Sequence, residues 1–286
     1  MPYYRGFYDR LRQNGFTEGR NLEIYRYSGE GQFEHFGDVI TEAILRMPDA
    51  IYLVDTRLLL ALKGATKSIP IVAIMVDPVR YGLAVSLARP GRNITGVAHD
   101  PGPDLYRKRF QLLKVAVPKA TTLGILASQA FIERSGLAKS KATARRAGIE
   151  LVFPIEAVYW REDEYRAAFA RMAREGVDLV IVTEQTENWT YRRSIIALAK
   201  EFGLPAIYPD RMFVELGGLM SFGPSWIDFG RECGRIVTEI LNGANPANSP
   251  IFQPTKYELS LNLRTAKHLE IDMPPSLIAQ AVEVIK

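Results

Sequence analysis

The sequence predicts an α/β fold built on parallel sheets, and three observations lead to this prediction. Segments with helical periodicity alternate with short apolar runs along the 286-residue chain. The runs are apolar at consecutive positions, which is typical of strands that helices cover on both faces. Glycines stand where helix C-termini are expected, as at Gly148, Gly176 and Gly203.

The first predicted elements are two helices, each followed by a buried strand. Apolar residues recur at helical spacing over 36–47, and the apolar run at 50–54 predicts a strand. A second helix is expected at 58–66. Pro70 then introduces a run at 71–76 that is too short for a helix and rich in β-branched residues, so it also predicts a strand.

The same alternation continues in the second part of the chain. A helix is predicted over 105–116, where Arg109 shares one stripe with leucines and an alanine. Further strands are predicted at 122–126, 149–153, 178–183, 205–208 and 219–222, and the helices between them end at Gly148, near Gly176, at 202 and before Gly217. The stretch near 97–104 is rich in proline and glycine and suits a crossing between domains. We expect two similar sheets in tandem, one on each side of this stretch.

Composition excludes several classes of protein. The 36 basic and 32 acidic residues are scattered, without a block of like charges, so no nucleic-acid partner is expected. Cys233 is the only cysteine, which rules out an internal disulfide and a cysteine-rich zinc site. No apolar stretch approaches the roughly 18 residues of a membrane span, and the first residues contain no apolar signal core.

Motifs for catalysis and for cofactor binding are missing from the sequence. His35, His99 and His268 are widely spaced and form no metal-ligand pattern, so no metal site is predicted. No Gly-x-Ser-x-Gly elbow, P-loop or dinucleotide-binding glycine motif is present. We therefore predict no cofactor, no catalytic residue and no enzymatic activity.

Position on the predicted sheets gives the candidate binding residues. Ligands of parallel α/β sheets collect beyond the carboxyl ends of the strands, close to helix N-termini. The polar and aromatic residues that follow the predicted strands are Asp55, Thr56, Asp77, Pro78, Ser128, Gln129, Glu184, Tyr208 and Asp210. Thr56 and Ser128 are equally compatible with plain helix N-caps, and Pro78 with the start of a helix or turn. The carboxylates of Asp77 and Glu184 could accept a ligand ammonium group.

Four segments carry a resemblance to a known family. They are KSIPIVAIMVDPVRYGLAVSLARPGRNITGV at 67–97, RRSIIALAKEFGLPAIYPDRMFVELGGLMSFGPS at 192–225, QPTKYELSLNLRTAKHLEIDMPPSLIAQAVEVI at 253–285 and EGRNLEIYRYSGEGQFE at 18–34. These strings resemble an uncharacterised family of ABC-transporter substrate-binding proteins, some of whose members bind tryptophan or related aromatic amino acids. The resemblance covers nearly the whole chain.

The resemblance implies a type I periplasmic-binding-protein fold, in which a hinge joins two Rossmann-like lobes and a solute binds between them. One lobe would comprise 1–98 and 225–250, and the other 99–224 and 251–286. The chain would be the solute-binding component of an uptake system, with a membrane permease and its ATPase as partners. The family further implies a periplasmic or membrane-anchored extracytoplasmic location.

Two departures from the family pattern affect these expectations. Relatives begin with an export signal and a first strand, and both are missing ahead of the helix that starts near Tyr4. We therefore expect a truncated chain or a misplaced start codon. In addition, Asp55-Thr56-Arg57 stands where relatives often carry Gly-Thr-Pro, so the class of the solute is left open.

For an amino-acid solute, the resemblance and the strand-end positions together suggest specific roles. Thr56 and backbone N–H groups near Asp77 and Pro78 would hold the carboxylate, Glu184 or Asp210 would face the ammonium group, and Tyr208 would contact the side chain. Two alternatives stay open. One is a ligand-sensing effector domain like that of LacI-type repressors, which would need a DNA-binding segment ahead of it. The other is an enzyme that uses the strand-end carboxylates.

Overall fold

The computed structural model describes residues 2–28, 33–99, 102–135, 148–153 and 161–286. The chain divides into two compact units, each made of two segments. Unit 1 comprises Met1–Asp100 and Ser225–Thr255, and unit 2 comprises Pro101–Pro224 and Lys256–Lys286. The two units are described separately below.

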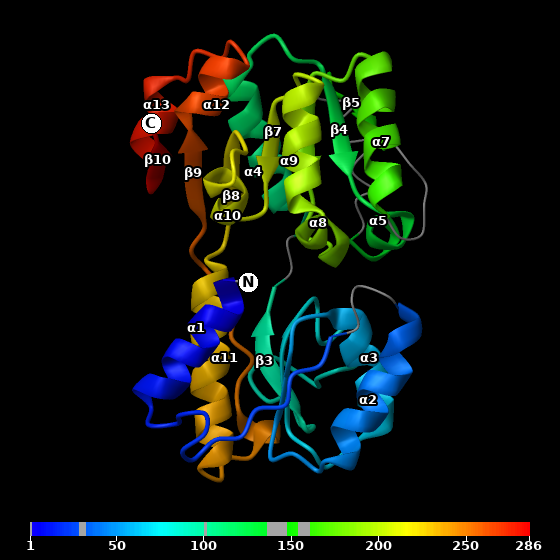
Figure 1. Ribbon diagram of the computed structural model, residues 1–286, viewed down its shortest axis with the longest axis vertical. Helices are drawn as coiled ribbons and strands as arrows, with labels where there is room; N and C mark the ends of the chain where they lie inside the picture. Colours follow the sequence, from blue (N-terminus) through cyan, green and yellow to red (C-terminus); the bar gives the residue numbers. More distant parts are fainter. Residues whose placement is uncertain (1, 29–32, 100–101, 136–147, 154–160) are drawn as a thin grey trace. The chain divides into compact units, whose positions relative to one another are not determined.

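Unit 1 is built on a parallel three-stranded sheet. Its strands are β1 (Ile51–Leu53), β2 (Ile71–Met75) and β3 (Ile94–Ala98), in the order β1-β2-β3. Every residue of β2 and β3 is buried, because helices cover both faces of the sheet (Figure 1). The helices of unit 1 are α1 (Pro2–Gln13), η1 (Phe33–His35), α2 (Phe36–Leu45), α3 (Thr56–Ala65), α11 (Trp226–Leu241) and η3 (Pro246–Asn248).

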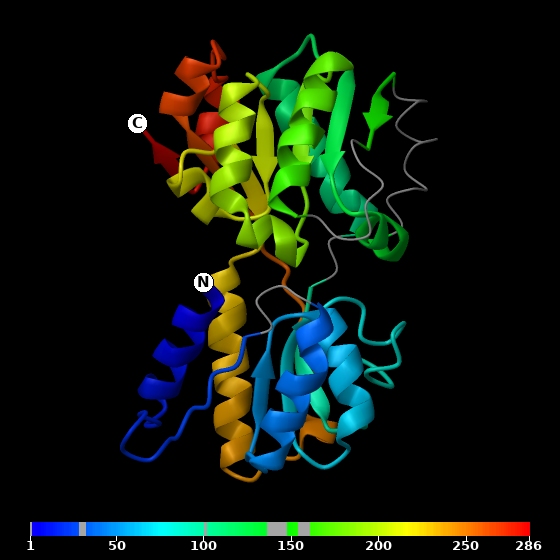
Figure 2. The same cartoon turned by 45° about the vertical axis from the view of Figure 1, so that its right-hand side comes forward.

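Helices α1 and α11 come from distant parts of the sequence and lie side by side (Figure 2). Two glycines allow their backbones to touch. A Cβ atom on Gly6 would lie 2.0 Å from the Ile227 carbonyl oxygen, and one on Gly230 would lie 1.8 Å from the Tyr3 carbonyl oxygen. Any larger residue at either position would push the helices apart.

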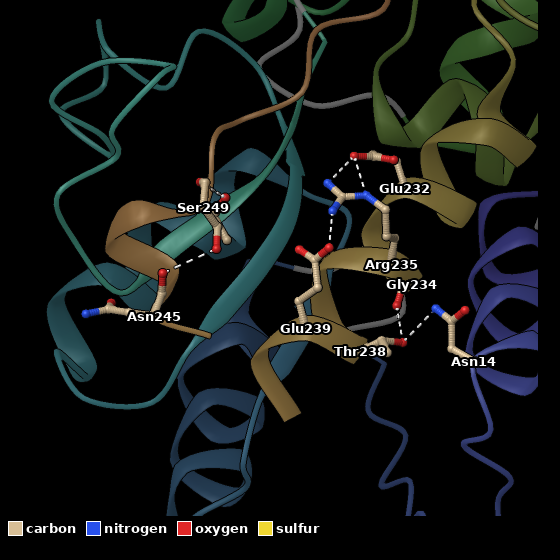
Figure 3. Close-up of polar contacts among 9 residues, drawn as sticks. Asn14, Glu232, Gly234, Arg235, Thr238, Glu239, Asn245 and Ser249 are labelled. Carbon is tan, nitrogen blue, oxygen red and sulfur yellow. Dashed lines mark hydrogen bonds and ion pairs between the residues drawn. The ribbon is translucent and has the colours of Figure 1, made fainter. Parts of the chain in front are cut away.

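Polar contacts hold the far end of this helix pair (Figure 3). The Asn14 side chain donates to the Thr238 hydroxyl at 3.1 Å, and that hydroxyl donates to the Gly234 carbonyl at 2.8 Å. On the exposed side of α11, Arg235 forms ion pairs with Glu232 and Glu239, one helical turn away on either side. Such exposed pairs add little to stability.

Unit 2 contains a seven-stranded sheet in the order β10-β9-β8-β7-β6-β4-β5. Its pairs are parallel except for β8 and β9, which run antiparallel with Met220 opposite Leu261. The strands are β4 (Thr122–Leu126), β5 (Glu150–Val152), β6 (Leu179–Val182), β7 (Ala206–Tyr208), β8 (Met220–Gly223), β9 (Glu258–Asn262) and β10 (Glu283–Ile285).

Helices cover this sheet on both faces (Figure 1). They are α4 (Gly102–Ala116), α5 (Gln129–Ser135), α7 (Glu162–Arg174), α8 (Thr186–Thr190), α9 (Arg192–Glu201), α10 (Arg211–Glu215), α12 (Leu263–His268) and α13 (Pro275–Gln280). Leu179 and Ile181 of β6 belong to the core cluster that includes Leu113 of α4 and Leu277 of α13. All four residues of β6 are buried, which explains its uninterrupted apolar sequence.

The structure confirms the predicted α/β class and its parallel sheets. The expectation of two similar sheets is wrong, because the described residues contain a sheet of three strands before residue 100 and one of seven strands after it. The sequence signal is weak for β10, an edge strand that is only half-buried and begins with Glu283. The helix predicted to end at Gly148 falls outside the described residues. None of the described helices combines the length and apolar composition that a membrane span requires.

Candidate functional site

The carboxyl end of β1 leads directly into the first turn of α3, and Asp55 lies at this junction. Its Oδ1 atom accepts hydrogen bonds from the backbone N–H groups of Arg57 at 2.7 Å and Leu58 at 3.2 Å, so Asp55 is the N-cap of α3. The Arg57 guanidinium pairs with the other carboxylate oxygen at 3.0 Å. Burial alone would raise the pKa of Asp55, but Arg57 and the two amides lower it below its ordinary value.

Thr56 joins the ends of two neighbouring strands of unit 1. It is the first residue of α3, so the alternative that Thr56 is the N-cap is wrong. Its hydroxyl instead accepts a hydrogen bond at 3.1 Å from the N–H of Val76, which follows β2. Because the oxygen is the acceptor in this bond, the hydroxyl hydrogen can be donated to another group.

Asp77 and Pro78 form a tight turn after β2. Asp77 has a φ of 37°, in the left-handed region, and its carboxylate accepts from the Arg80 N–H at 3.1 Å. The Pro78 carbonyl accepts from Leu83 at 2.7 Å and from Ala84 at 3.1 Å. A non-glycine residue in this conformation costs about 1–2 kcal/mol. Strained backbone of this kind is found preferentially at binding sites. The hydrogen bond between Val76 and Thr56 connects this turn to the start of α3, where Asp55 lies.

In unit 2, Glu184 follows β6 and is bound by two side chains of α4. Its Oε1 lies 2.5 Å from Nη1 of Arg109, and its Oε2 accepts from the Tyr106 hydroxyl at 2.6 Å. Arg109 also donates through Nε to the Phe222 carbonyl at 2.7 Å. The Arg109 side chain is fully buried and that of Glu184 is 5% exposed. Both oxygens of Glu184 therefore have partners within the unit.

Sequence reasoning missed Arg109 and Tyr106 as site residues. Arg109 lies on the apolar stripe of its predicted helix, and the apolar residues around it make the stripe read as core. The usable signal was the charge itself, because an arginine on a buried helix face needs a buried acidic partner.

Ser128 and Gln129, which follow β4, have different surroundings. The buried Ser128 caps α5 through the Phe131 N–H at 3.2 Å, and its own N–H donates to Gln185 at 2.7 Å. Gln185 directly follows Glu184, so Ser128 lies beside the end of β6. Gln129 instead pairs along α5 with Glu133 at 2.8 Å and joins no other predicted site residue.

Tyr208 and Asp210 lie at the end of β7, the strand next to β6. The Tyr208 ring is buried and stacks on Phe213 with centroids 5.1 Å apart, and burial raises its pKa. Asp210 caps α10 through the Met212 N–H at 2.7 Å. Burial raises the pKa of Asp210 to about 6, and the Met212 hydrogen bond offsets only part of this rise. Glu184, Tyr208 and Asp210 therefore lie at the same edge of the unit 2 sheet.

The predicted site residues supply hydrogen-bond acceptors, hydrogen-bond donors and one aromatic ring. Within the residues that the structure describes, no three histidine, cysteine or acidic side chains gather closely enough to hold a metal ion. The polar groups of each unit lie at the carboxyl ends of parallel strands, as in α/β proteins that bind small molecules.

Comparison with known proteins also points to α/β proteins that bind small molecules. The fold matches solved structures with the type I periplasmic-binding-protein fold. The family described as "ABC transporter substrate binding protein" matches residues 2–285, so the chain belongs to this family.

Three relatives illustrate the similarity. The "Tyrosine-binding protein" of Clostridioides difficile strain R20291 is 25% identical over 284 residues, which cover 99% of this chain and 79% of the relative. An ABC domain from Streptococcus pneumonia, solved in complex with L-Trp, has a TM-score of 0.87 and 24% identity, covering 99% of this chain and 94% of that one. A conserved domain protein from Vibrio cholerae has a TM-score of 0.88 and 26% identity, with the same coverage of both chains.

Proposed function

We propose that this protein is the solute-binding component of an ABC-type uptake transporter and that its solute is an amino acid, with aromatic amino acids the first candidates. The observation that carries the proposal is the family match over residues 2–285, together with a tyrosine-binding relative that is similar over 99% of the chain. The L-Trp complex of the Streptococcus relative supports the same solute class.

The proposed role of unit 1 is to hold the solute carboxylate. Thr56 supplies a hydroxyl that is anchored by Val76 N–H and has a hydrogen to donate. Backbone N–H groups in the turn at Asp77 and Pro78 would add further donors. A carboxylate accepts several such bonds at once, and bonds to a charged group are the stronger kind.

The proposed role of unit 2 is to face the ammonium group and the side chain. Glu184 supplies a carboxylate that pairs with Arg109, and in this proposal the solute ammonium group would share that carboxylate. Asp210 is the other candidate, and a bound cation would lower its raised pKa again. Tyr208 would contact the solute side chain only after a movement of its present neighbour Phe213.

The transport role follows the family. In this proposal the solute-loaded form is recognised by a membrane permease with its ATPase, outside the cytoplasm, and the solute is held by hinge closure without covalent change. A binding protein of this kind returns its solute unchanged, whereas an enzyme with strand-end carboxylates would convert it.

A thermal-shift screen of the full chain against the common amino acids tests the proposal. Ligand at 100 times its Kd stabilises the folded state by about 2.7 kcal/mol, which raises the melting temperature by several degrees. L-Tyrosine and L-tryptophan are expected to give the largest shifts, and calorimetry then gives their Kd. The D-enantiomers serve as matched controls. If no amino acid shifts the transition, or if the solute is consumed, the proposed function is wrong.

A further inference from the structure

The side chains of Asp55 and Arg57, the residues on either side of Thr56, form an ion pair in unit 1. The two side chains are 12% and 13% exposed, so both charges are largely removed from water. Arg57 approaches both oxygens of Asp55, with Nη2 at 3.0 Å from Oδ2 and Nε at 3.4 Å from Oδ1. The pair therefore presents a positive and a negative charge together at the end of β1.

Asp55 changes what the start of α3 can bind. A helix N-terminus ordinarily attracts an anion through its unpaired N–H groups and its dipole. Here the Asp55 carboxylate already accepts two of those N–H groups. A solute carboxylate that binds to the next residue, Thr56, would therefore meet a like charge close by.

Arg57 is the group that removes this conflict. Its hydrogen bond and its charge act on Asp55 and keep the pKa of that acid low. The other cations nearby serve different contacts, since Lys63 donates to the Tyr81 carbonyl at 3.3 Å and Arg80 is exposed. Without Arg57, the edge of β1 would carry an uncompensated negative charge next to Thr56.

We propose that Arg57 determines the charge class of the solute, because it cancels Asp55 and so allows a free carboxylate to bind at Thr56. This inference rests on the proposed function, in which Thr56 holds the solute carboxylate. It predicts that loss of Arg57 converts unit 1 from a surface that accepts amino acids into one that prefers the corresponding amines.

The test compares an amino acid with its decarboxylated amine on matched variants. The probes are L-tyrosine with tyramine and L-tryptophan with tryptamine, titrated by calorimetry into the full chain. The variants are Arg57→Gln, Arg57→Lys and the double variant Asp55→Asn/Arg57→Gln. Asparagine caps helices as well as aspartate does, so the double variant keeps the cap of α3 without its charge. Arg26→Gln is the control, because Arg26 also pairs with a carboxylate in unit 1, that of Glu18.

Arg57→Gln is expected to weaken amino-acid binding by about tenfold or more, while the affinity for the amine changes by less than about threefold, because only the amino acid carries a carboxylate that Asp55 would repel. Arg57→Lys and the double variant are expected to return the amino-acid affinity to within about threefold of wild type. Arg26→Gln should leave both affinities unchanged.

Three results would overturn the inference. In the first, Arg57→Gln loses affinity for the amino acid and for the amine equally. In the second, Arg57→Gln binds the amino acid as wild type does. In the third, neither Arg57→Lys nor the double variant restores amino-acid affinity. If Arg57→Gln does not fold, Asp55→Asn, which keeps the cap and leaves Arg57 in place, decides the question. It is expected to strengthen binding of the amino acid relative to the amine, and an unchanged ratio of the two affinities would overturn the inference. If wild type binds none of the four probes, the proposed solute class fails, which is a separate outcome from a wrong role for Arg57.

Discussion

An ion pair of an arginine and an acid lies at a strand end in each unit, and the two pairs differ in burial and in how the chain makes them. Asp55 and Arg57 are two residues apart and share the first turn of one helix. Arg109 and Glu184 come from a helix and a strand end that are distant in sequence, and their side chains are 0% and 5% exposed. A pair that is local in sequence and partly accessible to water changes the charge of the surface around it. A pair that joins distant segments and is shielded from water also stabilises the fold of its unit.

The largest expected effect comes from breaking the deeper pair. Arg109→Met leaves Glu184 buried without its counter-charge, and loss of one partner of a buried ion pair costs about 3–5 kcal/mol. Urea unfolding of the variant measures this loss. Replacement of both partners, in Arg109→Met/Glu184→Met, should recover most of it. A single variant that loses less than about 1 kcal/mol would show that the pair is not structural.

The second prediction concerns Asp210, a buried acid with no ion pair among the described residues. Its pKa is about 6 in the folded chain and near 4 when unfolded, so the folded state is destabilised as pH rises from about 4 to 6. Asp210→Asn keeps the cap and is expected to gain ~3 kcal/mol at pH 8 and nothing at pH 3.5. Unfolding curves at the two pH values check this. An equal effect at both would mean that charge burial is not the cause.

A third prediction compares how much Tyr106 and Arg109, the two partners of Glu184, each contribute to stability. Tyr106→Phe removes one hydrogen bond to a charged acceptor and leaves the ion pair intact, so a loss of about 1.5–3 kcal/mol is expected. The loss should be smaller than that of Arg109→Met in the same unfolding assay. An equal or larger loss would indicate that the tyrosine, rather than the arginine, keeps Glu184 in place.

The smallest expected effect is on the local pair. Arg57→Gln is expected to cost about 1 kcal/mol of stability, because Asp55 retains two backbone amides and some contact with water. Its effect on solute affinity should be larger than its effect on unfolding. Arg26→Gln, which breaks an exposed pair, should stay within about 0.5 kcal/mol of wild type. If the Arg57 variant is as unstable as Arg109→Met, the contrast between the two pairs fails.

Local features of the fold were predictable from sequence, whereas the connections between distant segments were not. Continuous apolar runs identified β2, β4 and β6, because these strands are buried on both faces. Periodicity does not encode the order of strands in a sheet. It also missed β3, in which Gly96 and Thr95 interrupt the apolar run although every residue is buried.

The candidate site shows the same limit. Knowledge of strand ends was sufficient to select Asp55, Thr56 and Glu184, since each lies two or three residues beyond the end of a strand. It could not distinguish the capping role of Asp55 from that of Thr56, because both residue types cap helices and the difference is one of backbone geometry. The partnership of Arg109 with Glu184 depends on the packing of α4 on the sheet, which no local pattern reports. The solute-binding role of these residues stays a prediction.

The glycine contact between α1 and α11 has a consequence for biosynthesis. A nascent chain emerges from the ribosome in order, and domains generally fold as units while it does so. Helix α1 emerges long before α11, so the groove that receives it, formed around Gly230, appears only after about 200 further residues have been made. Helix α1 must therefore wait without its main packing partner, while strands β4 to β8 of the other unit are already available to pair.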